Sequence, residues 1–251
     1  MTRDLLALGT EVAVTAGRAL LARQDDVGRV DYKTSSTDPV SEADRAAERL
    51  IAGALLDARP DDGLIGEEGA DRKGSTGLRW VVDPIDGTVN YLYGLPAWCV
   101  SIACEDDEGA VVGVVYQPVT GTTYGGVRGE GSWCDGTALR VNDPVPLERA
   151  LVATGFSYEV AQRTRQAAAV ARLLPQVRDI RRLGSAALDL CMLAAGMVDA
   201  YYETTTKHWD WAAGALIARE AGARVTHDAG AVVAAGPALY PALHTALAGG
   251  T

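Results

Sequence analysis

Two different hydrophobic patterns divide the chain near residue 145, and they constrain the fold more than any other feature. From Trp98 to Arg140, one short apolar stretch follows another, with glycine, aspartate or proline between them. This predicts an antiparallel meander. From Leu151 onward, strand patterns alternate with helix patterns, which predicts a second sheet covered by helices. We therefore expect one unit over 1–251, with an N-terminal α+β half (1–145) and a C-terminal α/β half (146–251).

The predicted elements follow from the spacing of apolar residues. Apolar residues recur at three- and four-residue steps over 3–23 and again after Ser41, which predicts two amphipathic helices. A β-branched strand over 79–82 stops at an Asp-Pro pair. In the second half the predicted order is strand 150–154, helix 162–174, strand 178–182, helix 185–196, strand 199–203, helix 211–221 and strand 223–226.

The charge of the chain excludes some classes of partner. The 251 residues carry 23 Lys and Arg against 33 Asp and Glu, a formal net charge of −10. Such a chain has no overall attraction for nucleic acid or an anionic membrane, so neither is expected as a partner. With no long apolar run, no visible secretory signal and four cysteines outside any zinc spacing, the expected location is cytoplasmic. A phosphorylated substrate would need a local cation.

The segment Asp83-Pro84-Ile85-Asp86-Gly87-Thr88 carries the strongest chemical signal. A lone Asp-Pro pair would indicate only a turn. Here two carboxylates stand three residues apart, and Pro84 restricts the link between them. Gly87 and Thr88 then offer free backbone amides before a predicted helical turn. Carboxylates suited to a metal beside amides suited to a phosphate indicate phosphoryl chemistry.

Three further acidic segments are ambiguous when each is taken alone. Gly66-Glu67-Glu68-Gly69 is typical of a solvated loop, while Asp210 and the Ser41–Asp44 pair are typical of helix starts. Gathered in one cleft, however, about five carboxylates would need a compensating cation. Because the available ligands are all oxygens, that cation would be Mg²⁺ rather than zinc or copper. The set is Glu67, Glu68, Asp83, Asp86 and Asp210.

Taken together and in this order, the motifs resemble those of the inositol monophosphatase family of metal-dependent phosphatases. The resemblance spans roughly Asp31 to Ala223, most of the chain. It implies an α/β (α+β) fold, namely a layered α-β-α-β-α sandwich of the inositol monophosphatase and fructose-1,6-bisphosphatase type, and a homodimer. The segments that carry it are 38–44 (Asp-Pro-Val-Ser-Glu-Ala-Asp), 66–68, 83–90, 184–187 (Gly-Ser-Ala-Ala), 200–203 (Ala-Tyr-Tyr-Glu) and 209–214.

The resemblance also implies metal ligands. It implies two or three Mg²⁺ ions per site, for which Mn²⁺ is a substitute. Glu67, Asp83 and the backbone carbonyl of Ile85 resemble the ligands of the first ion. Asp83, Asp86 and Asp210 resemble the ligands of the second, with Asp83 bridging, and Glu68 is a further candidate residue.

Other residues match catalytic and substrate-binding positions of the family. Asp44, Thr88 and Glu67 match positions that handle the attacking water. The implied reaction is in-line attack of a metal-activated water on a phosphate monoester, without a covalent intermediate. Lys33 matches a lysine near the site. The implied substrate contacts are Asp86, Gly87, Thr88, Gly184, Ser185, Ala186, Glu203 and Asp210.

The substrate is the open question. Glu203 and the Gly-Ser-Ala-Ala run resemble the inositol-phosphate branch best, so inositol 1-phosphate is expected. Histidinol phosphate and fructose 1,6-bisphosphate are alternatives, as is a non-catalytic, metal-binding regulatory protein. The threonine run at 204–206 departs from the family pattern. We interpret the arginines of 178–182 as a solvated strand edge or a subunit contact, and His208 as a loop or rim residue.

Overall fold

The computed structural model describes residues 2–24, 30–32, 39–228 and 230–248. Lys33 lies outside these ranges, so its predicted place near the site stays a prediction. The helices are α1 (Thr2–Leu21), α2 (Glu42–Ala58), α3 (Thr88–Leu92), α4 (Val160–Leu173), α5 (Ala186–Ala194), α6 (His208–Glu220) and α7 (Tyr240–Ala248). The short 3₁₀ turns are η1 (Leu147–Arg149) and η2 (Leu174–Gln176).

Strands form a hairpin and two sheets among the described residues. The hairpin pairs β1 (Val30–Tyr32) with β2 (Pro39–Ser41). The first sheet has the order β10-β9-β8-β7-β6-β5-β3-β4 and the second the order β12-β11-β13-β15-β14. The first contains β3 (Gly63–Gly66), β4 (Asp71–Arg72), β5 (Arg79–Asp86), β6 (Cys99–Asp106), β7 (Gly109–Gln117), β8 (Thr122–Val127), β9 (Gly131–Cys134) and β10 (Thr137–Ala138). The second contains β11 (Leu151–Thr154), β12 (Asp179–Arg181), β13 (Ala200–Thr204), β14 (Arg224–Asp228) and β15 (Ala231–Ala235).

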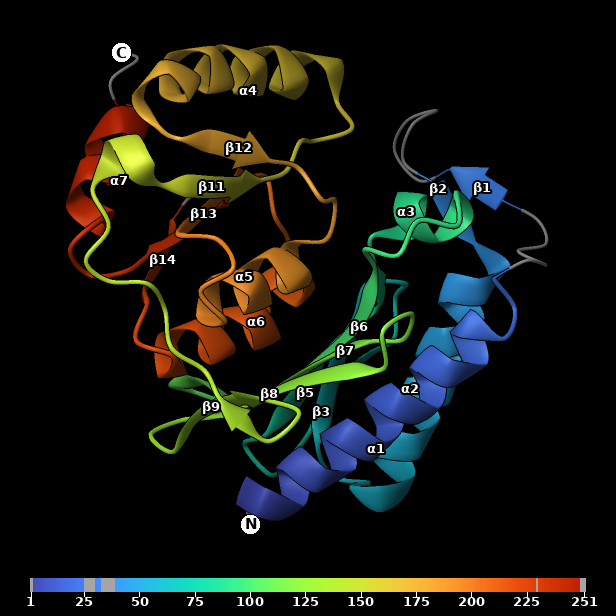
Figure 1. Ribbon diagram of the computed structural model, residues 1–251. Helices are drawn as coiled ribbons and strands as arrows, with labels where there is room; N and C mark the ends of the chain where they lie inside the picture. Colours follow the sequence, from blue (N-terminus) through green and yellow to red (C-terminus); the bar gives the residue numbers. More distant parts are fainter. Residues whose placement is uncertain (1, 25–29, 33–38, 229, 249–251) are drawn as a thin grey trace.

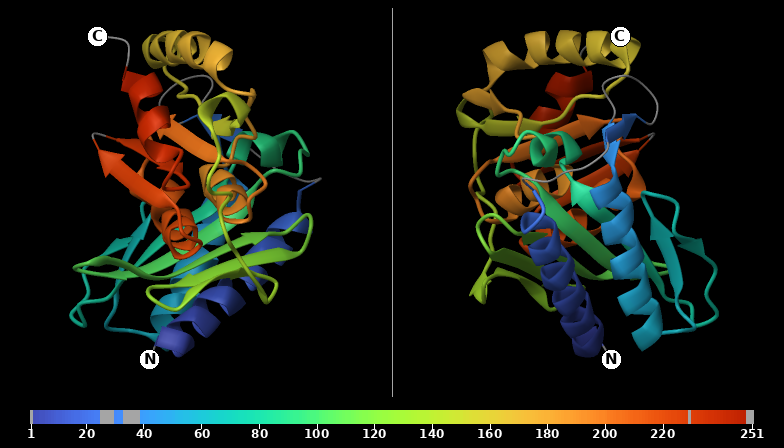
Figure 2. Two further views of the ribbon diagram at one scale, coloured as in Figure 1. Left: turned by 60° about the vertical axis from the view of Figure 1, so that its left-hand side comes forward. Right: turned by 90° about the vertical axis from the view of Figure 1, so that its right-hand side faces the viewer.

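The elements stack in five layers, as the resemblance implies. Helices α1 and α2 cover one face of the first sheet, and α5 and α6 lie between the two sheets (Figures 1 and 2). Helices α4 and α7 lie on the outer side of the second sheet (Figure 1). In this order, ends of strands from both sheets border one common cleft.

The first sheet confirms the predicted meander. Strands β5 to β10 pair antiparallel in chain order. In the glycine-rich segment 125–131, Gly125 and Gly126 belong to β8. A Cβ at Gly126 would lie 3.2 Å from Ile217, so glycine lets α6 approach the sheet closely.

The second sheet mixes parallel and antiparallel pairing. Strand β11 is parallel to both β12 and β13. Strand β15 pairs antiparallel with β13 and β14, and neither β15 nor α7 is predicted from the sequence. The parallel trio is what matters for the site, because its three carboxyl ends meet at one edge.

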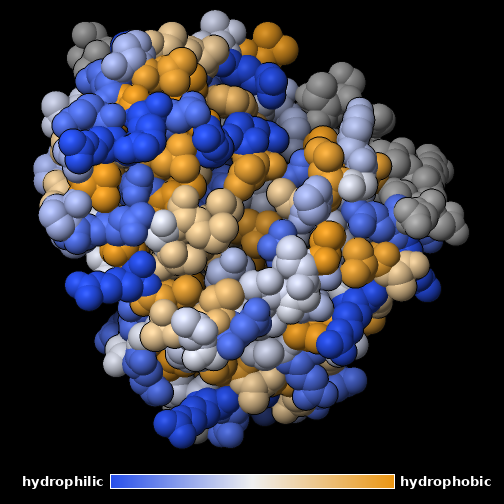
Figure 3. Space-filling model, in the orientation of Figure 1, coloured by the Kyte–Doolittle hydropathy of each residue, from blue (hydrophilic) through white to orange (hydrophobic). Residues whose placement is uncertain are grey.

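Apolar packing holds these layers together. Leu5 and Val12 of α1 are buried with Trp80 of β5 in the core between the first sheet and its outer helices. Burying side chains of this size stabilises the fold by roughly 1.5–3 kcal/mol each. Hydrophilic and hydrophobic residues mix over the face seen in Figure 3. Within the described ranges, every helix is too short or too polar to cross a bilayer.

Candidate active site

The first two predicted ligands lie at the carboxyl ends of neighbouring parallel strands. Strands β3 and β5 are parallel, with Gly66 opposite Val82. Glu67 follows β3 directly, and its amide donates to the Val82 carbonyl at 3.2 Å. Asp83 therefore lies beside Glu67 at the same edge of the sheet.

The Asp83–Asp86 segment bulges where it leaves the sheet. Its pairing with β6 shifts register between Asp83 and Asp86, because Pro84 has no amide to continue the ladder. The Ile85 amide instead donates to the Asp83 carboxylate at 3.0 Å. This local turn leaves both carboxylates buried, with exposed fractions of 2% and 8%.

Asp86, the last residue of β5, is hydrogen-bonded to the start of α5. Its Oδ2 accepts hydrogen bonds from the Ser185 hydroxyl at 2.6 Å and from the Ala187 amide at 2.7 Å. These donors stabilise the carboxylate, yet burial outweighs them and raises its pKa to about 6. The contact brings Ser185, a predicted substrate residue, against a predicted metal ligand.

Asp210 reaches the cleft from the first turn of α6. The helix begins at His208, earlier than predicted, so Asp210 is its third residue rather than a residue before it. Its Oδ2 accepts the Lys207 amide at 2.6 Å, which completes a cap. Burial raises its pKa well above the usual range, and the charges of Asp86 and Glu67 add to this.

The pKa of Asp83 shows that four carboxylates lie close together in the site. Burial raises its pKa strongly, and the neighbouring charges of Glu67, Asp86 and Asp210 raise it further. Like charges this close cannot all stay ionised without compensation. Among the described residues, no group of three or more acidic, histidine or cysteine side chains is already arranged as a metal site. The carboxylates of Asp86 and Asp210 instead accept hydrogen bonds from the Ser185 hydroxyl and the Lys207 amide.

These side chains surround a cavity of about 130 Å³, the acidic cleft. It contains the predicted ligands, both residues of the phosphate turn, and predicted substrate residues. Glu68 and Ser185 are not among its lining residues. The lining residues are Glu67, Asp83, Ile85, Asp86, Gly87, Thr88, Gly155, Phe156, Tyr158, Arg182, Gly184, Ala186, Glu203 and Asp210.

The predicted water-handling pair is joined by hydrogen bonds. The Thr88 hydroxyl lies 3.3 Å from Oδ1 of Asp44 and 3.1 Å from the Ile85 carbonyl. Asp44 is fully buried on α2. Gly87 has a φ of +101°, and a Cβ there would lie 2.9 Å from the Ala97 carbonyl. Only glycine fits this turn, which presents the amides that precede α3.

Glu203 forms the far wall of the cleft at the end of β13. The Tyr201 hydroxyl donates to its Oε2 at 3.0 Å. A Cβ on Gly155 would overlap the Glu203 carboxylate, so the two segments are in close contact. Burial raises the pKa of Glu203 to about 7, although the hydrogen bond from Tyr201 opposes the rise.

Glu48 supports the Glu67 loop and was not predicted. This buried side chain on α2 accepts the Glu68 amide at 2.7 Å and the Ala70 amide at 2.8 Å. A Cβ at Gly66 would overlap its carboxylate. Sequence spacing gives no direct signal for such a contact, because Glu48 stands 20 residues before Glu68 and looks like any helical acid.

A larger cavity of about 540 Å³, the outer pocket, adjoins the acidic cleft. The two share Glu67, Phe156, Tyr158, Glu203 and Asp210. The outer pocket is also lined by 157–159, Gln162, 205–207, Trp209 and Gly230. The threonine run of the sequence therefore borders this space.

Sequence reasoning missed several residues at this end of the second sheet. Phe156 and Tyr158 follow β11, and Arg182 follows β12. The carboxyl ends of adjacent parallel strands are the usual ligand edge of such a sheet, and this signal could have found them. Arg182 thus lines the cleft, whereas we expected a solvated edge or subunit contact. His208 contacts Glu105 and Trp211 and lines neither cavity.

Comparison with known proteins agrees with this geometry. The model of the inositol monophosphatase family matches residues 1–249. An inositol-1-monophosphatase of Mycobacterium leprae is 46% identical over 88% of this chain and 81% of that protein. A Nus factor SuhB of Xylella fastidiosa is 38% identical over 92% and 84%. The crystal structure of extragenic suppressor protein suhB from Bartonella henselae gives a TM-score of 0.93 at 34% identity, covering 99% of this chain and all of that one.

Proposed function

We propose that this chain, which belongs to the inositol monophosphatase family, hydrolyses inositol 1-phosphate in a reaction that requires Mg²⁺. The observation that carries the proposal is the acidic cleft, where Glu67, Asp83, Asp86 and Asp210 converge beside the Gly87 turn. Burial of so many acids is costly unless a cation compensates them. An anionic phosphate enters such a cleft only when the cation reverses its local charge.

The donor set fits Mg²⁺. The five groups that match the family's ligands are all oxygens of residues that line the cleft, and none is a sulfur or an imidazole. They are the carboxylates of Glu67, Asp83, Asp86 and Asp210 and the backbone carbonyl of Ile85. We propose that they hold two or three Mg²⁺ ions, which Mn²⁺ can replace. When bound, such ions lower the pKa of a coordinated water and offset the charge of the phosphate.

The chain's own residues orient the attacking water. The Thr88 hydroxyl accepts from the water while it donates to Oδ1 of buried Asp44, 3.3 Å away. Asp44 thereby fixes the direction in which the Thr88 lone pairs point. The amides of Gly87 and Thr88 bind the non-reacting phosphate oxygens, so the phosphorus faces the water.

The alcohol part of the substrate extends toward the outer pocket. Glu203 accepts hydrogen bonds from the hydroxyls of the alcohol when the Glu203 carboxyl is ionised. Gly184 leaves room beside the ester, since a Cβ there would lie 2.6 Å from the Arg182 guanidinium. A neutral polyol suits this wall, because its many hydroxyls can satisfy Glu203. We expect a homodimer, as the family resemblance implies.

Phosphate release from a panel of four esters tests the proposal. The panel contains myo-inositol 1-phosphate, fructose 1,6-bisphosphate, L-histidinol phosphate and 3′-phosphoadenosine 5′-phosphate, each with saturating Mg²⁺. The highest kcat/KM is expected for the inositol ester. A preference for another ester would contradict the substrate while keeping the chemistry.

A non-catalytic regulatory role is a second candidate, and one observation favours it. A relative 38% identical to this chain bears the name Nus factor SuhB. The Asp86→Asn variant separates the two roles, because it removes a ligand while keeping the volume of the side chain. Our proposal expects turnover to collapse in a folded protein. Absence of Mg²⁺-dependent release by the wild-type chain from every ester would favour the regulatory role.

A further inference from the structure

The outer pocket has the volume that the acidic cleft lacks. The cleft measures about 130 Å³. In the proposed function, the metal ions and the phosphate group share this space. The adjoining 540 Å³ must therefore receive the alcohol. Two of its walls are segment 156–159, which follows β11, and segment 203–207, which runs from the end of β13 to the residue before α6.

A single buried amide joins these two walls. Gln166 lies on α4, is 7% exposed and lines neither cavity. Its Oε1 accepts the Ser157 amide at 2.9 Å. Its Nε2 donates to the Thr204 hydroxyl at 2.8 Å and lies 3.4 Å from the Thr204 carbonyl. Removing one partner of such a buried bond leaves the other unsatisfied.

The wall that Gln166 holds is also strained. Thr205 has a φ of +71°, a conformation that β-branched residues rarely adopt. Strain of this kind persists only where the surrounding structure fixes the backbone. Gln166 fixes it on one side at Thr204, and the Thr206 amide fixes it on the other by donating to the Gly230 carbonyl at 3.1 Å.

We propose that Gln166 is a positioning residue for substrate selectivity. By joining Ser157 to Thr204, it holds the two walls of the outer pocket at the separation that the polyol requires, without touching the substrate. It acts on binding of the alcohol and leaves phosphate binding in the acidic cleft unchanged. This inference rests on the proposed function, in which the outer pocket receives the alcohol.

The test removes the hydrogen bond between Gln166 and Thr204 by changing each partner in turn. Gln166→Leu removes the amide at similar volume, and Thr204→Val removes the hydroxyl that it contacts. For each variant, kcat and KM are measured with inositol 1-phosphate, and inhibition by inorganic phosphate gives a Ki for the cleft alone. We expect KM to rise about tenfold, the equivalent of about 1.4 kcal/mol, with kcat and the phosphate Ki within twofold of wild type. The double variant should be no worse than Gln166→Leu.

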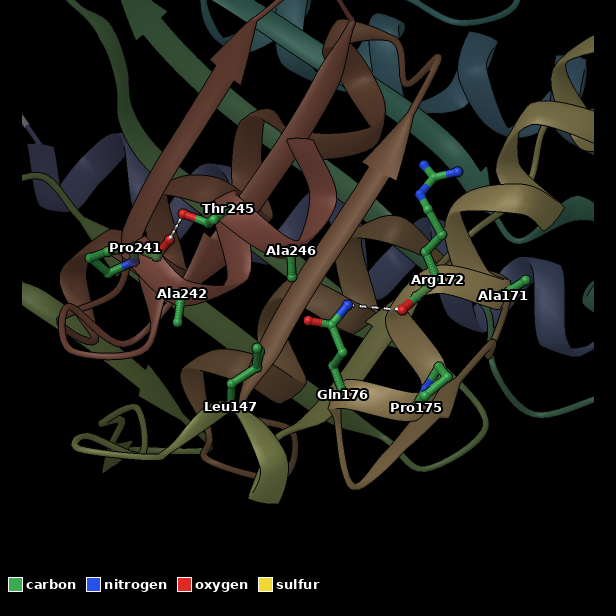
Figure 4. A pocket seen from close by; sticks show the side chains of 9 residues that line it. All are labelled: Leu147, Ala171, Arg172, Pro175, Gln176, Pro241, Ala242, Thr245 and Ala246. Carbon is green, nitrogen blue, oxygen red and sulfur yellow. Dashed lines mark hydrogen bonds between the residues drawn. The ribbon is translucent and has the colours of Figure 1, made fainter. Parts of the chain in front are cut away.

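A matched control uses another glutamine of the second half. Gln176 donates to the Arg172 carbonyl at 2.9 Å in a separate cavity of about 780 Å³ near α7 (Figure 4). Gln176→Leu should leave KM unchanged. Should Gln166→Leu fail to fold, Thr204→Val removes the same hydrogen bond from the other end and is expected to raise KM as well.

The outcomes separate this inference from the proposed function. An active wild-type enzyme whose KM is unchanged in folded Gln166→Leu and Thr204→Val would overturn the inference alone. Equal losses in kcat and phosphate affinity would also overturn it, because they would mean a merely structural role. A wild-type chain without Mg²⁺-dependent turnover of any ester would overturn the proposed function, and the inference with it.

Discussion

The acidic cleft and the outer pocket share a wall but are built in different ways. The cleft depends on short motifs, in which Asp83, Asp86, Gly87 and Thr88 come from six consecutive residues. The outer pocket depends on single residues from loops after β11 and β13, held by Gln166 from outside. In the proposed function, the cleft carries groups for chemistry on phosphorus, whereas the outer pocket offers space and Glu203 for an alcohol.

This difference teaches that reaction and selectivity can vary separately in one site. A change in the cleft should alter the charge on which the binding of any phosphate ester depends. A change at a residue that lines only the outer pocket should alter only the fit of the alcohol. The predictions below test this separation, from the largest expected effect to the smallest.

Asp83→Asn should cause the largest loss. This carboxylate lies beside Glu67, Asp86 and Asp210 and would contact both metal ions. Losing one charge there should lower kcat by about 1,000-fold, since metal-assisted charge stabilisation is worth several kcal/mol. Steady-state phosphate release at saturating Mg²⁺ measures it, with circular dichroism as the folding check. Unchanged Mg²⁺-dependent turnover would break the assignment of the cleft.

Glu48→Gln should weaken metal binding more than binding of the alcohol. Glu48 holds the Glu67 loop through the amides of Glu68 and Ala70. Loss of such a supporting group typically costs about 10–100-fold in metal affinity or activity. We expect the Mg²⁺ concentration for half-maximal rate to rise about tenfold, with KM unchanged at saturating Mg²⁺. Exposed Glu42 on the same helix gives the control, Glu42→Gln, and an equal change there would contradict the role of Glu48.

The metal-free protein should lose stability as pH rises. Burial raises the pKa of Asp86 to about 6 and that of Glu203 to about 7. Because both values exceed those of the unfolded chain, the native state binds more protons between about pH 4 and 7. A tenfold difference in proton affinity between the native and unfolded chain lowers the unfolding free energy by about 1.4 kcal/mol across that window. Thermal melts in EDTA should therefore give a lower Tm at pH 8 than at pH 5.

Mg²⁺ should reverse this loss, because it binds the ionised carboxylates. The rise in Tm on adding Mg²⁺ should be larger at pH 8 than at pH 5. An equal rise at both pH values would show that the buried acids of the cleft do not bind the ion.

Thr205→Gly should have the smallest effect and acts on the outer pocket only. Glycine adopts a φ of +71° without strain. We expect a gain of about 0.5 kcal/mol, which corresponds to a Tm increase of about 1–2 °C. Thr120, an exposed loop residue, provides the control. A Tm that falls by as much as in Thr120→Gly would mean that Thr205 is unstrained.

How much the sequence could predict follows the same division. The stripe of α2 and the Asp83–Thr88 segment combine local spacing with recognisable chemistry, so both could be found without coordinates. The five-layer order came from the resemblance rather than from periodicity. Strand β9 has four residues and α7 is rich in alanine with little charge, so neither shows the alternation on which such predictions depend.

The rest could not be predicted because it depends on contacts between distant segments. Glu48 meets an amide 20 residues away, and Gln166 meets Thr204, 38 residues away. Arg182 belongs to an arginine-rich stretch whose chemistry alone suggests a surface. The pairing of β11 with β12 and β13 brings Arg182 to the loops that follow β11 and β13.

Phosphate release from inositol 1-phosphate after removal and return of the metal tests the central claim most directly. The wild-type chain is stripped with EDTA, assayed, and then titrated with Mg²⁺. The account predicts no release in the stripped protein and saturable recovery as Mg²⁺ is added. Release that continues without any divalent cation would contradict the role assigned to the acidic cleft.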